Sequence, residues 1–319
     1  MEAFCTGLFP FDHELVDAAD VRGKNWRVAY EDVEWGIRPS GSRRQAVIYA
    51  RSCRAASNAY HLILSALAAR RGDYGEACSE FPRPINGNTY EEMSSLVGDA
   101  NIVSGARGCA FIPDSVRIAA RSSMSVDLQY GILKYAASGT VYSVNWIDVD
   151  PFFSTVHLGV SWSKANHVAY ANAIVGYYSV IEQIGAEIRA SKDKPSMIKG
   201  AWNPVVHIDL TDRLVSRGVC VDVKQVWHRR GGVSLVESNT LNGVDTERAE
   251  WSRGAYCRDC MIDVRDAIRI SSALRSKVSS HRIDRKAAGL SAYDVVNVKE
   301  VSRRILLTSL GCRICEERT

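Results

Sequence analysis

The sequence has no long apolar run, no leader-like start and no marked excess of charge. No window holds the roughly 18 uninterrupted apolar residues of a transmembrane helix. The nearest one, residues 168–188, is interrupted by Asn172, Glu182, Gln183 and Glu187. The N-terminal segment carries acids early and has no basic stretch before an apolar one, so it does not resemble a signal or transit peptide. We therefore expect a cytoplasmic protein without membrane partners.

Internal repeats and low-complexity tracts are also missing, so 319 residues leave room for one large or two ordinary globular domains. A net charge of +4 is too small by itself to define a nucleic-acid-binding protein, so local clusters of cations have to carry any such function. Nine cysteines without an export signal indicate a reducing compartment, where thiols stay free or bind metal instead of forming disulfides.

Helical patterning dominates what is present. Helices are predicted over residues 43–70, 115–138, 164–190, 211–217, 261–278 and 291–311. A capping box formed by Ser42 and Gln45 would open the first of them. Extended chain is predicted over 140–149 and 154–162, a loop over 72–110 and irregular exposed chain over 219–256. We predict a mainly α protein, in which an N-terminal region of unknown role with some extended segments, residues 1–160, precedes a helical bundle over residues 161–319.

The last two predicted helices are joined by a short connection and should pack antiparallel. The final helix opens at Ser291, with Asp294 three residues later, and ends at Gly311. Its apolar residues recur every three or four positions and are Val295, Val298, Val301 and Ile305. The start of the first helix and the end of the second are therefore expected at the same end of the pair.

Two cysteine pairs flank this predicted helical hairpin. Cys257 and Cys260 precede its first helix, and Cys312 and Cys315 follow its second. If the helices are antiparallel, the four thiols converge, and four thiolates are the ligands of a tetrahedral structural zinc ion. Buried or unpaired thiols and redox chemistry are the alternatives. Because protein ligands would fill all four positions, such a zinc ion would leave no open site for catalysis.

An arginine and a histidine stand where the predicted helix 261–278 ends. Arg275 and His281 match the spacing of an arginine, four to six residues and a histidine, as do Arg54 and His61 on a mostly polar face of the first predicted helix. Further cations gather around the first pair; they are Lys277, Arg282, Arg285 and Lys286. A helix C-terminus favours positive charge through its dipole. A solvated helix end is therefore one interpretation, and a phosphate-binding site is the other.

From about residue 160 to its end the chain resembles the HEPN superfamily. A long helix carries an acidic residue in "YYSVIEQIGAEIRA", a shorter helix follows, the next helix ends in "RSKVSSH", and "YDVVNVKEVSRRILLTSL" forms a final packed helix. The resemblance implies an antiparallel bundle of four or five helices that dimerises and acts as a metal-independent endoribonuclease, often a toxin or an effector of defence against phage. Ser276 stands where this family often has Asn, Asp or His.

The residue types suit that chemistry. RNA supplies the 2′-hydroxyl as its own nucleophile, so cleavage to a 2′,3′-cyclic phosphate needs a proton carrier and a stabiliser of negative charge, with no catalytic metal. His281 is suited to the first task and Arg275 to the second. Glu182 would orient one of them, with an ordinary exposed helix acid as the alternative. Ser276, Lys277, Arg282, Arg285 and Lys286 would hold the RNA backbone.

One helix cannot aim both side chains at a single atom, because six residues at 100° each rotate His281 about 120° away from Arg275. A composite site across the axis of a homodimer resolves this. Two other classes of protein stay open. One is a catalytically silent helical module that binds RNA or a partner or regulator protein. The other is a zinc-stabilised DNA-binding or regulatory protein.

Overall fold

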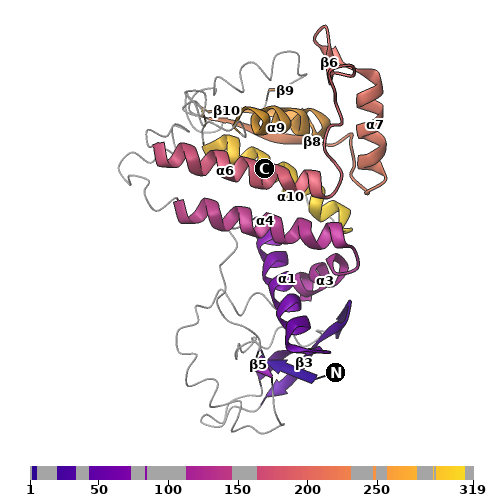
Figure 1. The fold of residues 1–319 in the computed structure, drawn as a ribbon, viewed down its shortest axis with the longest axis vertical. Helices are drawn as coiled ribbons and strands as arrows, with labels where there is room; N and C mark the ends of the chain where they lie inside the picture. Colours follow the sequence, from indigo (N-terminus) through magenta and orange to yellow (C-terminus); the bar gives the residue numbers. More distant parts are fainter. Residues whose placement is uncertain are drawn as a thin grey trace. The chain divides into compact units, whose positions relative to one another are not determined.

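The computed structural model describes residues 2–5, 20–33, 43–72, 83–84, 113–145, 164–230, 247–248, 257–278, 290 and 292–312. Within them the chain is mainly helical, with a few short antiparallel strands, as the sequence predicted (Figure 1). It forms two compact units, Met1–Arg71 with Gly75–Leu133 and Gly72–Tyr74 with Lys134–Thr319. The predicted break near residue 160 lies outside the described residues, and the boundary between the two units falls earlier in the sequence, between Leu133 and Lys134.

The first unit contains a five-stranded antiparallel sheet in the order β2-β3-β4-β1-β5. Its strands are β1 (Glu2–Cys5), β2 (Val21–Gly23), β3 (Trp26–Val33), β4 (Arg43–Ala50) and β5 (Arg83–Pro84). Trp26 and Val28 on β3 and Ile48 and Ala50 on β4 are buried at the spacing of one sheet face, and Ala29 is buried as well.

The predicted helix over residues 43–70 is therefore wrong in its first third. β4 pairs along its whole length with β3, and its apolar run over residues 46–50 contains the β-branched Val47 and Ile48. The helix α1 (Cys53–Arg71) begins only after Ser52, whose hydroxyl accepts a hydrogen bond from the Ala55 N–H at 3.2 Å. Ser52, and not Ser42, is the N-cap.

Two helices replace the single helix predicted over residues 115–138. They are α3 (Pro113–Ser122) and α4 (Val126–Asn145). The hydroxyls of Ser122 and Ser123 donate to carbonyls three residues back, at 2.8 and 2.6 Å, and this competition with the backbone ends α3. α4 continues through residues 140–145, so the extended segment predicted there is helical, whereas residues 154–162 lie outside the described part.

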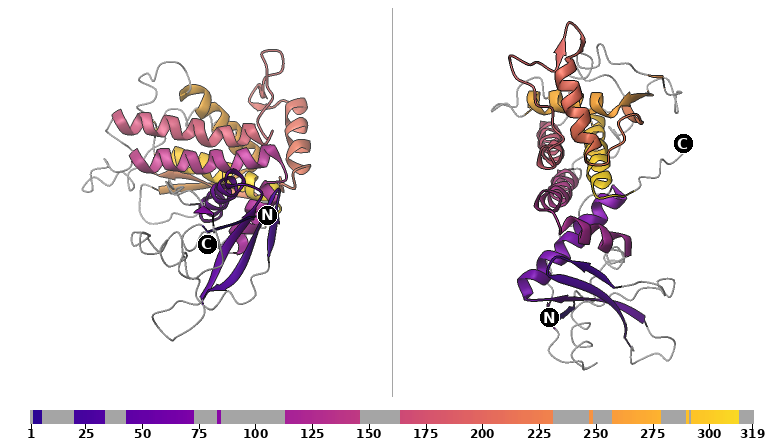
Figure 2. Two further views of the ribbon diagram at one scale, coloured as in Figure 1. Left: turned by 60° about the horizontal axis from the view of Figure 1, so that its bottom comes forward. Right: turned by 90° about the vertical axis from the view of Figure 1, so that its right-hand side faces the viewer.

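The second unit is built around α6 (Lys164–Gln183), which packs against both α9 (Val264–Val278) and α10 (Ala292–Ser309). In the right-hand view of Figure 2, α6 is seen nearly end-on, with α9 and α10 against it. The predicted core residues of the final helix, Val295, Val298, Val301 and Ile305, are all fully buried, which confirms the apolar face predicted for it. The shorter helix α7 (Pro204–Val215) contacts α9.

A three-stranded antiparallel sheet in the order β8-β10-β9 completes the second unit. β8 (Lys224–Arg230) lies in the stretch predicted to be irregular, and β10 (Cys257–Asp263) occupies the start of the predicted helix 261–278. β9 (Glu247–Arg248) is the third strand. Trp227 of β8 is fully buried, and burial of this aromatic residue beside the β-branched Val226 favours the strand.

The outer edge of β8 is closed by a side chain of α10. The amide of Asn297 accepts a hydrogen bond from the His228 N–H at 2.8 Å and donates one to the His228 carbonyl at 2.9 Å. Asn297 is only 2% exposed. It therefore replaces the backbone partner that another strand would supply, and it satisfies two groups of an edge strand.

Three helices of this unit end at a glycine with positive φ. Gly185, Gly218 and Gly311 have φ of 67°, 77° and 71°, and each is followed by a backbone bond to the helix from the next residue. The predicted ends at Gly218 and Gly311 are confirmed. The predicted helix 164–190 is too long, because Gly185 stops α6, and the predicted helix 211–217 starts too late, because Asn203 caps α7 and Pro204 opens it.

Candidate functional site

The predicted acid and the predicted arginine meet at the contact between α6 and α9. Glu182 lies in the last turn of α6 and Arg275 in the last turn of α9. Their side chains form an ion pair, with Arg275 Nη2 at 3.3 Å from Glu182 Oε1. Each side chain is 38% exposed. The pair is therefore reachable from solvent, and a group there is only partly screened by water.

Arg275 keeps donors for a ligand after it has paired with Glu182. A guanidinium offers five N–H donors in a fixed plane, and the ion pair uses one of its terminal nitrogens. Its Nε is buried and has no hydrogen-bond partner among the described residues. An anion that approaches the half-exposed face would find a charged fork already held in one orientation.

A buried tyrosine lies beside this pair. Tyr178 is one turn before Glu182 on α6 and is 3% exposed. Its hydroxyl forms hydrogen bonds with the Ser272 side chain and the Ile188 backbone. Burial raises the pKa of the Tyr178 hydroxyl, and the charge of Glu182 raises it further. The hydroxyl is therefore neutral at physiological pH and links α6 to α9 one turn below the ion pair.

The neighbouring serine of the predicted motif uses its hydroxyl within the helix. Ser276 Oγ donates to the Ser272 carbonyl at 2.8 Å, and the side chain is exposed. Lys277 is half-buried. His281, Arg282, Arg285 and Lys286 lie outside the described residues. The described structure thus brings together two of the three predicted catalytic residues, and it adds Tyr178 and Ser272, which the sequence analysis missed.

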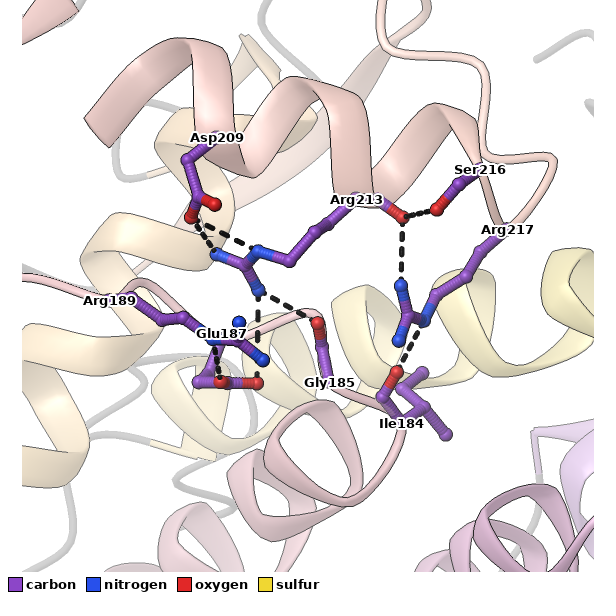
Figure 3. A network of polar contacts seen from close by, with 8 residues as sticks. All are labelled: Ile184, Gly185, Glu187, Arg189, Asp209, Arg213, Ser216 and Arg217. Carbon is purple, nitrogen blue, oxygen red and sulfur yellow. Dashed lines mark hydrogen bonds and ion pairs between the residues drawn. The ribbon is translucent and has the colours of Figure 1, made fainter. Parts of the chain in front are cut away.

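Arg213 of α7 and Arg217, just after α7, hold the end of α6 that carries Glu182 (Figure 3). Arg213 donates to the Gly185 carbonyl at 2.7 Å and to Asp209 at 2.8 and 3.1 Å. Arg217 donates to the Ile184 carbonyl and, at 3.0 Å, to the Arg213 carbonyl. Guanidinium groups on the free carbonyls of a helix C-terminus satisfy those groups and complement the dipole. The last turn of α6 is therefore fixed to α7.

The same network extends to the segment after α6. Glu187 pairs with Arg189 at 2.9 Å and lies 3.9 Å from Arg213 (Figure 3). A side chain at Gly185 would be strained by the φ of 67°, and its Cβ would lie 2.7 Å from Arg217 Nη2, so this guanidinium would have to shift. The positive φ explains why a glycine follows the end of α6.

The cysteines of the two predicted pairs that the structure describes lie on β10 and just after α10. Cys260 is buried on β10, directly opposite the buried Trp227, and Cys312 is half-buried just after α10. Cys257 is three positions before Cys260 on the paired strand β10. Cys315 lies outside the described residues.

Only part of the predicted tetrahedral site lies within the described residues. Among those residues, no three His, Cys, Asp or Glu side chains form a group that could hold a metal ion. Cys260 occupies the place of a small apolar side chain.

The alternative arginine and histidine pair lies in the first unit. Arg54 is exposed in the first turn of α1, and His61 is half-buried with its ring 5.9 Å from that of Tyr60. The two residues occupy one face of one helix, seven positions apart. Arg54 has no acidic ion-pair partner among the described residues, which is a clear difference from Arg275.

Fold and composition define a mainly helical protein, in whose described part no helix is long and apolar enough to cross a membrane. Comparisons with family models, with curated proteins and with solved structures each return no match for the chain.

Proposed function

We propose that the chain is a metal-independent endoribonuclease of the HEPN type. The observation that carries the proposal is the 3.3 Å ion pair between Glu182 and Arg275, which joins two helices far apart in sequence at a half-exposed position. A pair exposed to this degree contributes about 0–1 kcal/mol to stability. We therefore assign the ion pair a role in orienting the Arg275 guanidinium and not in stabilising the fold.

In the proposed reaction the RNA 2′-hydroxyl attacks the adjacent phosphorus and the bond to the 5′-oxygen of the next nucleotide breaks. His281 takes the proton of the 2′-hydroxyl or gives one to the leaving oxygen. Arg275 binds the phosphate oxygens as their negative charge grows. The products are a 2′,3′-cyclic phosphate and a 5′-hydroxyl, and no metal ion takes part in this step.

We further propose that two copies of the chain form the complete site. The bundle would dimerise so that Arg275 and His281 of both subunits face one cleft, which Ser276, Lys277, Arg282, Arg285 and Lys286 would line with hydrogen-bond donors and positive charge. A cytoplasmic toxin or phage-defence effector regulated by another protein fits this chemistry. Residues 1–160 would be the region open to such regulation.

Purified chain incubated with RNA in EDTA tests the proposal. We expect cleavage to continue, since no step needs a metal, and we expect the fragments to end in 2′,3′-cyclic phosphates. His281→Ala should abolish cutting and relieve growth inhibition on expression. Loss of cutting in EDTA, or equal cutting by His281→Ala, would contradict the proposal. RNA binding without cutting by the wild type would instead indicate the silent module.

A structural zinc ion at Cys257, Cys260, Cys312 and Cys315 stays a separate prediction. If all four cysteines bind the ion, residues 257–260 of β10 have to give up their pairing with β8. We expect about one zinc per chain by metal analysis if the prediction holds, with loss of the metal in Cys257→Ser and Cys312→Ser. Unchanged zinc content in both variants, or none in the wild type, would remove the site.

A further inference from the structure

The segment between α6 and α7 carries three lysines without an ion-pair partner in the described part of the chain. Lys192, Lys194 and Lys199 are exposed, and none of them forms an ion pair among the described residues. Arg189, at the start of the segment, is paired with Glu187. The only acid between residues 190 and 200 is Asp193. We call Lys192, Lys194 and Lys199 the lysine cluster.

The segment has a defined backbone in spite of its exposure. Ser191 and Lys194 exchange two backbone hydrogen bonds of 2.9 and 3.2 Å, which close a tight turn. Asn203, which is 7% exposed, donates to the Pro195 carbonyl at 3.0 Å, and its backbone N–H donates to Ser196 at 2.9 Å. A ligand that binds the lysine cluster therefore meets side chains on a fixed backbone, which lowers the entropic cost of binding.

Lys199 stands at a position that disfavours lysine. It is the first residue of the two-residue turn between β6 (Met197–Ile198) and β7 (Ala201–Trp202), with φ of 51°, and Gly200 follows with φ of 84°. Two positive φ angles define a type I′ turn, for which Asn, Asp or Gly is preferred. A lysine here costs local stability and forms no ion pair among the described residues, so its charge is available to a partner.

The hairpin of β6 and β7 is attached to the helix that carries Arg275. Trp202 Nε1 donates to Asp266 Oδ1, in the first turn of α9, at 3.0 Å. Arg269 lies over the Trp202 ring, with its Cζ 5.9 Å from the ring centre. Arg275 follows Asp266 by nine residues, about 14 Å along the helix at 1.5 Å per residue. The residue that holds the hairpin and the arginine of the proposed site therefore lie near opposite ends of one helix.

We propose that the lysine cluster is a second binding surface for the phosphate backbone of the RNA, which it holds a few nucleotides from the phosphate bound by Arg275. This inference rests on the proposed function. A single strand that leaves the cleft has a phosphate for each lysine, and the ammonium groups bind these as point charges without reading bases. The lysine cluster thus increases the affinity for RNA and sets the direction in which the strand leaves the site. The chemical step is performed by Arg275 and His281.

The test compares two variants with the same loss of charge. One carries Lys192→Gln, Lys194→Gln and Lys199→Gln, and the matched control carries Arg22→Gln, Lys24→Gln and Arg51→Gln, which are exposed in the first unit. Binding of labelled single-stranded RNA is measured in a His281→Ala background, and cleavage is measured with His281 present. For the lysine variant we expect roughly tenfold weaker binding near 0.1 M salt, a salt slope reduced by about two, and an unchanged kcat at saturating RNA.

The outcomes separate this inference from the proposed function. Failure of the wild type to cut RNA refutes the proposed function, whatever the binding result. Equal binding and equal salt slopes for the lysine variant and the control, or no RNA binding by the parent, overturn the inference even when the wild type cuts. A third outcome would also overturn the inference, in favour of a membrane surface. In that outcome the parent binds anionic vesicles, the lysine variant does not, and both bind RNA equally well.

Discussion

Replacing Arg275 by alanine is expected to lower kcat for RNA cleavage by roughly 10²–10³-fold, the usual cost of removing one donor to a developing oxyanion. Stability should change little, because the ion pair with Glu182 is 38% exposed on both sides. Arg275→Lys keeps the charge but loses the planar fork, so we expect it to recover only part of the rate. Single-turnover cleavage at saturating RNA measures the effect on the chemical step.

Glu182 should act through Arg275, and a double-mutant cycle can test this. Glu182→Gln is expected to lower kcat about tenfold, because a misplaced guanidinium stabilises the transition state less well. In an Arg275→Ala background the same change should have almost no further effect. Arg117→Ala, which removes an exposed ion pair with Asp114 at 3.4 Å in the first unit, is the matched control and should leave kcat unchanged. If Glu182→Gln lowers kcat just as much in the Arg275→Ala background, the positioning role of Glu182 is refuted.

Asn297→Ala is expected to lower the free energy of unfolding of the second unit by about 2–4 kcal/mol. The substitution leaves the N–H and the carbonyl of His228 without their partners, and each buried polar group left unpaired costs about 1–3 kcal/mol. Asn297→Asp should also destabilise, since it keeps the acceptor but sets an oxygen against the His228 carbonyl. Urea denaturation followed by circular dichroism measures both changes.

Asn172→Ala provides the control for that experiment. Asn172 is exposed on α6, so the same chemical change there removes no buried hydrogen bond. Alanine has the higher helix propensity, and we expect this variant to be as stable as the wild type or slightly more stable. A similar loss of stability in both variants would show that the Asn297 effect does not come from the two hydrogen bonds with β8.

The sequence predicted α10 well because three signals agree there: a start near Ser291, a repeating apolar face and Gly311 at the end. It failed over residues 43–50, where a continuous apolar run becomes a strand because β3 is available to pair with it. It failed again at β8, since Trp227 is buried by partners distant in sequence. In both places tertiary pairing overrides local preference.

Part of the candidate site could be predicted from the type of its residues and their positions in the sequence. Arg275 and Glu182 stand out by residue type and by position near helix ends, and the structure brings them into contact. Tyr178 and Ser272 give no such signal, because a tyrosine and a serine inside helices are ordinary. Only the crossing of α6 and α9 makes their contact visible. One cue was present, in that Tyr178 precedes Glu182 by four residues and so shares its face.

The amide of Asn297 also protects the folded chain from its neighbours. An open strand edge is a template on which a second molecule can add a strand, and such addition leads to aggregation. At His228 the donor and acceptor are already occupied from within, by a helix that is too bulky for an incoming strand to displace easily. A single internal amide therefore disfavours the addition of a foreign strand at this edge when the protein is concentrated.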